Sequence, residues 1–260
     1  MNRFGEMLKS WRETRGLSQL QLACDASVSA RHISFLETGR SRPSRDMVLH
    51  LSEVLAVPRT ARNGLLAASG FAPVYAAEPP DSDGLQPVLA AMSRLLDRHE
   101  PYPGVILDGL WRLRDLNRSA HRLFGLAGLG PADSLLDAMA KPGWGPGVVE
   151  NWGEVGHHAM VRLRAESLHA GGIAELDAAA ARLAADPVVA AWKLEEPLPP
   201  VVPTIYRARD LRLSLFSTIA QFRSAEDIAV ADLHIELMFP ADAAAQQALD
   251  ALDGDTGARS

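Results

Sequence analysis

The sequence predicts two domains of different fold class: an all-α, five-helix domain over residues 1–72, and an α+β domain over residues 85–252 in which helices cover an antiparallel sheet. Three observations support this division. Short apolar segments at helical spacing fill the first domain, whereas two alternating segments, typical of strands, lie near the end of the chain. The formal charge also divides: residues 1–70 carry 10 Lys and Arg against 6 Asp and Glu (+4), and residues 71–260 carry 16 against 26 (−10).

The composition predicts a soluble, cytoplasmic protein. Of the 260 residues, 47% are hydrophobic and 22% are charged, as in ordinary globular domains. No apolar run approaches the roughly 18–20 residues that a membrane span needs, and the charged N-terminus lacks the apolar core of a secretory signal. Cys24 is the single cysteine, which excludes an internal disulfide and a multi-cysteine zinc site. The basic first domain predicts a nucleic-acid partner.

Five short helices are expected in the first domain, because apolar residues recur there every three or four positions. The first covers residues 3–15, carries Phe4, Leu8 and Trp11 on one face, and ends at Gly16. The other four begin after typical helix-opening residues: Ser18 for the helix 19–25, Ser29 for the helix 30–37, Ser44 for the fourth and Pro58 for the fifth.

The helices 19–25 and 30–37 are joined by a short turn, which is the geometry of a helix-turn-helix motif. This part of the chain resembles the phage-repressor (Cro/C1, XRE-type) family. The matching residues follow one another without a gap: Gly16-Leu17-Ser18-Gln19, Leu22-Ala23, Val28-Ser29, Ile33, Leu36-Glu37-Thr38-Gly39-Arg40 and Pro43. The resemblance implies a regulator that binds double-stranded operator DNA.

The resemblance also implies a set of DNA-contacting residues: Gln19, Ser29, Ala30, Arg31, His32, Ser34, Phe35, Arg40 and Arg42. Gln19 is expected at a phosphate, and Arg31 is expected to donate to guanine in the major groove, which is worth about 1–3 kcal/mol of discrimination. Phe35 takes a position that is often polar in the family, so a thymine methyl contact is the alternative there. Arg40 and Arg42 are expected to give salt-dependent phosphate contacts. For His32 and Phe35, a position without DNA contact stays open.

Arg12 and Glu37 match positions that form a buried ion pair in some members of this family. A structural role is therefore expected for both, in preference to DNA contact. Because removing one partner of a buried pair costs about 3–5 kcal/mol, Glu37→Ala is expected to unfold the first domain before it changes DNA specificity.

The second domain follows a linker expected over residues 73–84, which is polar and contains proline. Its first helix starts near Leu85 and ends before Pro101. The pair Asp108-Gly109 predicts a tight turn between two short strands, and Asn117 is expected to cap the next helix.

The remainder is expected to contain helices first and strands afterwards. The expected elements are helices over 148–168 and 173–185, a segment opening at Asp186-Pro187, strands over 211–217 and 233–239, a final helix over 243–252, and a disordered tail over 253–260.

The order of these elements resembles the MmyB-like regulators, which join a Cro/C1-type domain to a PAS-like ligand-binding domain. The matching residues are Pro103 with the hairpin to Trp111, Asn117 with Leu123-Phe124-Gly125, Trp152, Leu163-Arg164, and Asp186-Pro187 with Trp192. The resemblance implies an apolar pocket between sheet and helices and a fatty-acid-like ligand. The chain departs from the family at Pro203-Thr204-Ile205-Tyr206, where a His-Pro pair is frequent, so no ligand contact is carried over there.

Six side chains are candidates for the pocket lining: Trp111, Phe124, Arg164, Leu213, Leu215 and His234. Core packing without a cavity is the alternative for the apolar ones. Arg164 either neutralises a ligand carboxylate or pairs with Glu150 or Glu166, and the pair is favoured. Because no Gly-rich phosphate loop, nucleophile elbow or His-Glu-x-x-His motif occurs, neither catalysis nor a metal or cofactor is expected.

Three functions remain open at this point. The first is a homodimeric regulator whose DNA binding responds to a small apolar ligand in the PAS-like domain. The second is a helix-turn-helix repressor whose second domain is a protein-interaction or assembly module without a small ligand. The third, and weakest, is a cofactor sensor or a vestigial enzyme.

Overall fold

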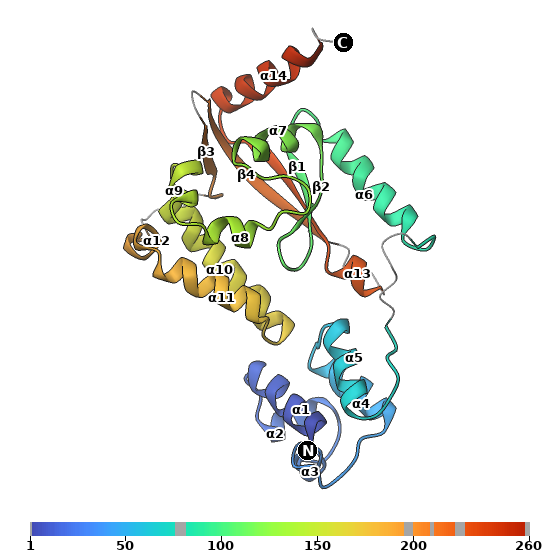
Figure 1. Cartoon of the computed structure of the whole chain (residues 1–260). Coiled ribbons are helices and arrows are strands. Elements are labelled where there is room, and N and C mark those ends of the chain that lie inside the picture. The colour runs from blue at the N-terminus through green and yellow to red at the C-terminus, as the bar shows by residue number, and fades with distance from the viewer. Residues whose placement is uncertain (1, 76–81, 195–199, 209–210, 222–226, 258–260) are drawn as a thin grey trace. The chain divides into compact units, whose positions relative to one another are not determined.

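The computed structural model describes residues 2–75, 82–194, 200–208, 211–221 and 227–257. These residues divide into two compact units, the first built mainly from α1–α5 and the second mainly from the elements that follow (Figure 1). The helices of the first unit are α1 (Arg3–Thr14), α2 (Gln19–Asp25), α3 (Ala30–Glu37), α4 (Arg45–Val54) and α5 (Arg59–Ala68).

Serine caps start three of these helices where the sequence predicts them. The hydroxyl oxygens of Ser18, Ser29 and Ser44 each accept a hydrogen bond from a backbone N–H in the first turn, at 3.1–3.2 Å. These bonds satisfy donors that a helix end otherwise leaves unpaired. The apolar faces of the helices then meet in one core, whose buried members include Phe4, Leu8, Trp11, Leu22, Ile33, Leu36, Leu51, Leu55, Leu65 and Leu66.

The second unit is built around a five-stranded antiparallel sheet in the order β2-β1-β5-β4-β3. Its strands are β1 (Gly104–Leu107), β2 (Leu113–Leu116), β3 (Thr204–Ala208), β4 (Leu211–Gln221) and β5 (His234–Pro240). The last strand in sequence, β5, lies at the centre and pairs with β1 and β4. The sheet is therefore complete only when β5, its last strand in sequence, joins β1 to β4.

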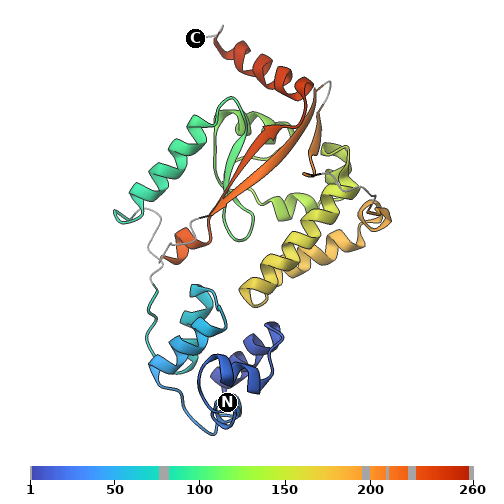
Figure 2. The same cartoon turned by 180° about the vertical axis from the view of Figure 1, so that it is seen from behind.

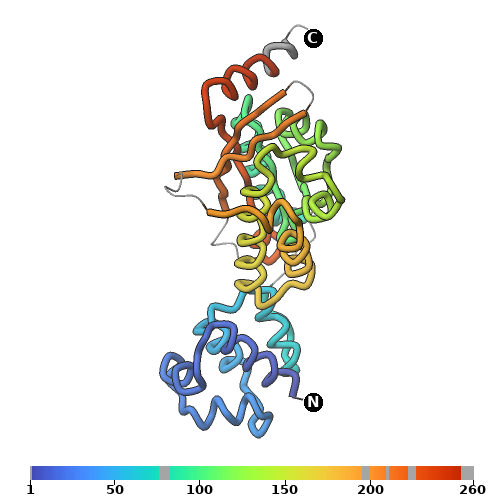
Figure 3. Tube along the Cα trace, turned by 90° about the vertical axis from the view of Figure 1, so that its left-hand side faces the viewer, coloured from blue at the N-terminus to red at the C-terminus, as the bar shows by residue number. Residues whose placement is uncertain are grey.

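The alternation of side chains along β5 gives the sheet two different faces. Ile235 packs with Ile106, Met92 and Leu96 under α6 (Gln86–Arg98), which covers one face (Figure 2). Met238 belongs to a second cluster on the opposite face. That face is covered by α7 (Arg118–Leu126), α8 (Leu135–Ala140) and α9 (Trp144–Val148), which lie together beside the strands in Figure 3.

Asn117 joins the first hairpin of the sheet to the neighbouring helices. Its carboxamide oxygen accepts from the N–H groups of Gly104 (3.1 Å) and Ala120 (2.9 Å), and the second of these bonds caps α7. Its amide nitrogen donates to the carbonyls of Leu96 (3.1 Å) and Tyr102 (2.8 Å). The side chain is buried, and it thereby satisfies four backbone groups of three different segments.

The remaining helices are α10 (Trp152–Ala170), α11 (Ala174–Ala185), α12 (Pro187–Ala191), α13 (Ile228–Ala231) and α14 (Ala243–Gly257). Trp152 is buried and its ring lies directly on Gly145 of α9, where a Cβ atom would approach the ring to 2.2 Å. Asp186 caps α12 by accepting from the N–H groups of Val188 (2.8 Å) and Val189 (3.1 Å).

Several elements differ from the sequence prediction. The connection between β1 and β2 spans residues 108–112 instead of a two-residue turn, and Trp111 adopts φ +55° there. Strand β3 and the helices α8 and α9 were not expected as separate elements, and α10 begins at Trp152 instead of 148. Strand β3 begins with Thr, Ile and Tyr, which favour strands, but apolar and polar residues do not alternate along its five positions, so periodicity did not predict it.

The ends of the predicted linker and tail also differ. Helix α14 extends to Gly257, five residues into the segment expected to be disordered. Residues 76–81 of the expected linker and residues 258–260 of the expected tail lie outside the described residues. In the described part of the chain, no helix is long and apolar enough to cross a membrane.

Candidate functional site

The pair α2–α3 presents one side of α3 to solvent. Leu22 and Ala23 of α2 and Ile33 and Leu36 of α3 are buried in the core of the first unit, which holds α3 against α2. Arg31, on the opposite side of α3, is exposed. A helix held in this way over a short turn can enter the major groove with its N-terminal residues foremost.

The expected DNA-contacting residues lie at or near this surface. Arg31, Arg40 and Arg42 are exposed, Ser29 is exposed at the helix cap, and the other five are half-buried: Gln19, Ala30, His32, Ser34 and Phe35. The hydroxyl of Ser29 accepts from the N–H of His32 and is thus engaged in capping α3. The surface therefore carries three cations that are available for an anionic partner.

Phe35 lies between two of these cations. The guanidinium carbon of Arg31 lies 5.1 Å from the centre of the Phe35 ring, and that of Arg40 lies 5.8 Å from it. Both distances are within the range of a cation–π interaction. At a position that is often polar in the phage-repressor family, an aromatic ring thus lies beside two side chains that are expected to contact DNA.

Arg12 and Glu37 form a buried, two-bond ion pair behind this surface. The Nε of Arg12 donates to Oε1 of Glu37 at 2.6 Å, and Nη2 donates to Oε2 at 3.0 Å. Nη1 of Arg12 donates to the carbonyl of Leu17 at 2.7 Å. The hydrogen bonding that Arg12 donates to Glu37 raises the pKa of Arg12, although burial opposes it, so the guanidinium stays charged.

Gln19 contributes to the same pair, which its sequence position did not indicate. Its amide nitrogen donates to Oε2 of Glu37 at 2.8 Å. Gln19, the first residue of α2, is therefore bonded to Glu37, the last residue of α3, and Glu37 is in turn bonded to Arg12 of α1. In this arrangement Gln19 holds α2 against the end of α3, and this structural role does not depend on contact with a phosphate.

Arg3 is a cation of this domain that the sequence reasoning missed. It lines a polar pocket of about 580 Å³ together with Arg42 and Ser41, between the start of α1 and the connection from α3 to α4. Its place in the first turn of α1 could have suggested an exposed side chain, but only the fold brings it to the same pocket as Arg42.

Among the pockets described below, none is lined by all six of the expected ligand-binding residues of the second unit. Phe124 and Leu215 are buried in the cluster that joins α7 to the sheet, which is the core-packing alternative. Leu213 is buried in the same cluster but also lines a pocket. Arg164 is exposed, and Glu150 pairs with Arg212 at 3.1 Å instead of with Arg164.

Arg162, two residues before Arg164, is the arginine that reaches the sheet. Its Nη1 donates to Glu236 Oε1 at 2.5 Å, and its Nη2 lies 3.1 Å from Nε2 of His234. Its guanidinium lies 4.5 Å from the centre of the Trp111 ring. Trp111 and His234 thus belong to a polar cluster around Arg162. Arg162 and Arg164 lie on different sides of α10, and no sequence pattern favoured Arg162 over Arg164.

The first pocket of the second unit lies between α7, α14 and the start of β4. Its volume is about 380 Å³ and most of its wall is apolar. Ser119, His121 and Arg122 supply its polar groups, and the apolar wall is formed by Pro101, Pro103, Leu123, Leu126, Leu211, Leu213, Leu249 and Leu252, with Gly125. The volume is within the range typical of small-ligand sites.

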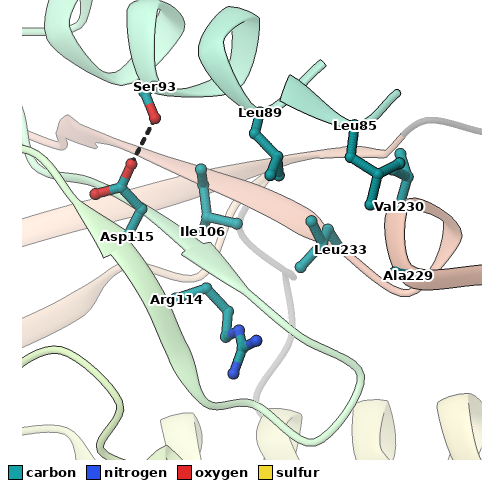
Figure 4. Close-up of a pocket in the computed structure, with 9 residues that line it drawn as sticks. All are labelled: Leu85, Leu89, Ser93, Ile106, Arg114, Asp115, Ala229, Val230 and Leu233. Carbon is teal, nitrogen blue, oxygen red and sulfur yellow. Dashed lines mark hydrogen bonds between the residues drawn. The ribbon is translucent and has the colours of Figure 1, made fainter. Parts of the chain in front are cut away.

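The second pocket lies under α6, on the other face of the sheet (Figure 4). Its volume is about 350 Å³, and its wall is formed largely by leucine, isoleucine and valine side chains. Ser93 donates to Asp115 Oδ2 at 2.7 Å at one end, and Arg114 also lines it. A register shift of β2 against β1 between Ile106 and Leu107 brings Arg114 and Asp115, neighbours in sequence, to the same pocket.

Comparisons with known protein families match a different domain model to the N-terminal and the C-terminal part of the chain. A helix-turn-helix domain model matches residues 3–65, which contain α1–α4 and most of α5. The model of the MmyB-like transcription regulator ligand binding domain matches residues 88–252, which is more than half of the chain. No curated protein matches the chain. The protein therefore belongs to the MmyB-like transcription regulators, with an N-terminal helix-turn-helix domain that binds DNA and a C-terminal ligand-binding domain.

Proposed function

We propose that the protein binds a specific operator as a homodimer through α3 of each subunit, and that a small apolar ligand of the fatty-acid type in the C-terminal domain regulates this binding. The observation that carries the DNA-binding part is the exposed side of α3, where Arg31 stands at the second helical position and Arg40 lies nearby. The domain that bears them has a net charge of +4, in a chain whose remainder has −10.

The DNA contacts divide into two kinds. Arg31 donates to a guanine edge, with Ala30, Ser34 and His32 beside it in the groove. Arg40, Arg42 and Arg3 contact phosphates and provide affinity that falls with salt and is independent of sequence. The buried Arg12–Glu37 pair keeps α3 in place for both kinds of contact.

Two copies of the chain supply the specificity that one short helix lacks. A single α3 contacts only a few base pairs, and a dimer with half-sites about 34 Å apart along the DNA doubles the number of readout contacts. A ligand that changes the spacing of the two DNA-binding domains then changes affinity, and a coupling of about 1–3 kcal/mol is enough for regulation.

The pocket between α7 and α14 is the better site for a fatty-acid-like ligand. Its leucine and proline side chains suit an acyl chain, and His121 and Arg122 are the groups that would meet a carboxylate. The pocket under α6 carries both Arg114 and the carboxylate of Asp115, so the attraction of a ligand carboxylate to one is offset by repulsion from the other. Of the six residues predicted from sequence, only Leu213 lines either of these two pockets.

The test is fluorescence anisotropy of labelled promoter DNA with the full-length protein, across salt concentrations, with and without decanoate. Arg31→Ala is expected to abolish sequence preference, whereas Arg94→Ala, an exposed arginine of α6, serves as the charge-matched control. Leu252→Trp, which adds bulk at the pocket between α7 and α14, is expected to remove the response to decanoate without changing DNA affinity. Sedimentation velocity measures the dimer.

Each part of the proposal has its own negative result. DNA binding that depends on Arg31 but ignores decanoate, at concentrations up to its solubility, removes the ligand and favours a repressor controlled by a partner protein. A monomer on a full operator contradicts the dimer. Equal binding of random and promoter DNA contradicts sequence-specific regulation as a whole.

A further inference from the structure

An aromatic ring, that of Phe35, belongs to the side of α3 expected to face DNA, at a position where the phage-repressor family often has a polar side chain. Phe35 is half-buried and does not belong to the core cluster of the first unit or to the apolar residues packed against it. Its ring is contacted instead by Arg31, one helical turn earlier, and by Arg40, five residues later. The stability of the core therefore does not explain a phenylalanine at this position.

The two arginines reach the ring for separate structural reasons. Arg31 and Phe35 are four residues apart on α3, so their side chains lie on the same face of the helix. Arg40 returns toward α3 because Gly39 adopts φ +76°, a left-handed conformation that ends the helix and reverses the chain. A side chain at Gly39 would also meet the Asn2 side chain at 2.8 Å.

An arginine side chain whose rotamers are already restricted loses less conformational entropy when it binds DNA. A free arginine samples many rotamers, and ordering them opposes each contact. A planar guanidinium stacked on an aromatic ring keeps its N–H edges available for a guanine or a phosphate while its face is occupied. The ring thus restricts the direction of the side chain without consuming its hydrogen-bond donors.

We infer that Phe35 is a positioning residue for DNA recognition: its ring directs the base-contacting Arg31 and the phosphate-contacting Arg40 before DNA binds. This inference rests on the proposed function, because it needs Arg31 and Arg40 to contact DNA. It assigns Phe35 a role through two other side chains, which differs from direct contact with a thymine methyl. The affinity that Phe35 contributes is therefore conditional on the two arginines.

The experiment begins with selection of a preferred site from random DNA by the full-length wild-type protein. Affinity for that site is then measured for Phe35→Leu, alone and in the Arg31→Ala, Arg40→Ala background. A rotamer-rich side chain that must be ordered on binding lowers the affinity about two- to tenfold, so Phe35→Leu, which removes the restraint on two arginines, is expected to weaken binding by about four- to a hundredfold. In the double-arginine background the same change is expected to have less than about twofold effect.

Three further measurements separate positioning from other roles. Phe35→Tyr, which keeps the ring, is expected to restore wild-type affinity. Phe71→Leu makes the same chemical change at a ring that packs against the core of the first unit and over which no described arginine lies; it is expected to lower stability but to leave the affinity of the folded protein unchanged. Thymine-to-uracil replacement, which removes the methyl group, is expected to leave the effect of Phe35→Leu intact.

The outcomes are distinct. A wild-type protein that selects no site contradicts the proposed sequence-specific function. If a site is selected but the loss from Phe35→Leu is the same with and without the arginines, the positioning role is wrong. If uracil replacement abolishes the effect of Phe35→Leu, the ring contacts the methyl group and the inference is overturned.

Discussion

Replacing Glu37 by alanine is the most informative perturbation of the DNA-binding domain. Glu37 is the last residue of α3, its side chain is only 3% exposed, and it accepts hydrogen bonds from Arg12 and Gln19. Glu37→Ala therefore removes three bonds and leaves the charged Arg12, whose side chain is 9% exposed, without its main partner.

The expected cost follows from the burial of both charges. Removing one member of a buried, hydrogen-bonded pair costs about 3–5 kcal/mol, because the remaining charge stays desolvated. An exposed pair contributes only about 0–1 kcal/mol. The same arginine offers both cases, since Glu13 also lies 3.6 Å from Arg12 but is 57% exposed. Glu13→Ala is thus a matched control with the same charge change and the same partner.

Hydrogen–deuterium exchange on the full-length protein measures this effect domain by domain. Amides of α1–α3 are expected to lose protection by more than about a hundredfold in Glu37→Ala, since each factor of ten corresponds to about 1.4 kcal/mol. Peptides from the sheet of the second unit are expected to keep their protection. The double variant Arg12→Met, Glu37→Met is expected to regain most of the loss, because an apolar pair carries no desolvated charge. Equal losses for Glu37→Ala and Glu13→Ala would refute the assignment of the pair as a buried structural element.

Three further predictions concern the second unit. Asn117→Ala removes the four hydrogen bonds of a buried side chain and is expected to cost at least about 3 kcal/mol in urea denaturation, whereas a loss near zero would show that water replaces them. Gly145→Ala places a Cβ atom 2.2 Å from the Trp152 ring and is expected to cost about 1–3 kcal/mol, measured in the same way; a neutral effect would mean that α9 moves freely. Burial opposes ionisation of Asp186, but hydrogen bonds from Val189, Trp152 and Val188 outweigh it and lower its pKa. Its carboxylate therefore stabilises the fold above the unfolded pKa, and this contribution is lost as the pH falls through the lower folded pKa. The deficit of Asp186→Ala, about 1 kcal/mol at neutral pH, should thus shrink on acidification below about pH 4 in pH-dependent denaturation, and a pH-independent deficit would contradict this.

Local signals determined most of the first domain. These signals are a serine cap, a helical period of apolar residues and a glycine after α3. Each acts over fewer than ten residues along the chain, so each can be recognised in the sequence. The start of α2 and of α3 follows directly from Ser18 and Ser29, and the pairing of Arg12 with Glu37 follows from the family pattern. In the second domain, the cap at Asn117 and the alternation of β5 were predictable for the same reason.

Long-range contacts decided what the sequence left open. Strand β3 forms by pairing with the edge of β4. Within Thr204–Ala208, apolar and polar residues do not alternate in the way that predicts a strand. The choice of Arg162 over Arg164 depends on which side of α10 meets β5. Phe35 meets Arg31 along α3, but it becomes a partner of Arg40 only because Gly39 turns the chain back toward the helix. The amino-acid sequence by itself determined the elements of the first domain, its DNA-binding class and most of the longer elements of the second domain, because these depend on neighbours along the chain. Only the tertiary structure decided which side chains share a cavity or a cluster, because packing joins residues that are distant in sequence.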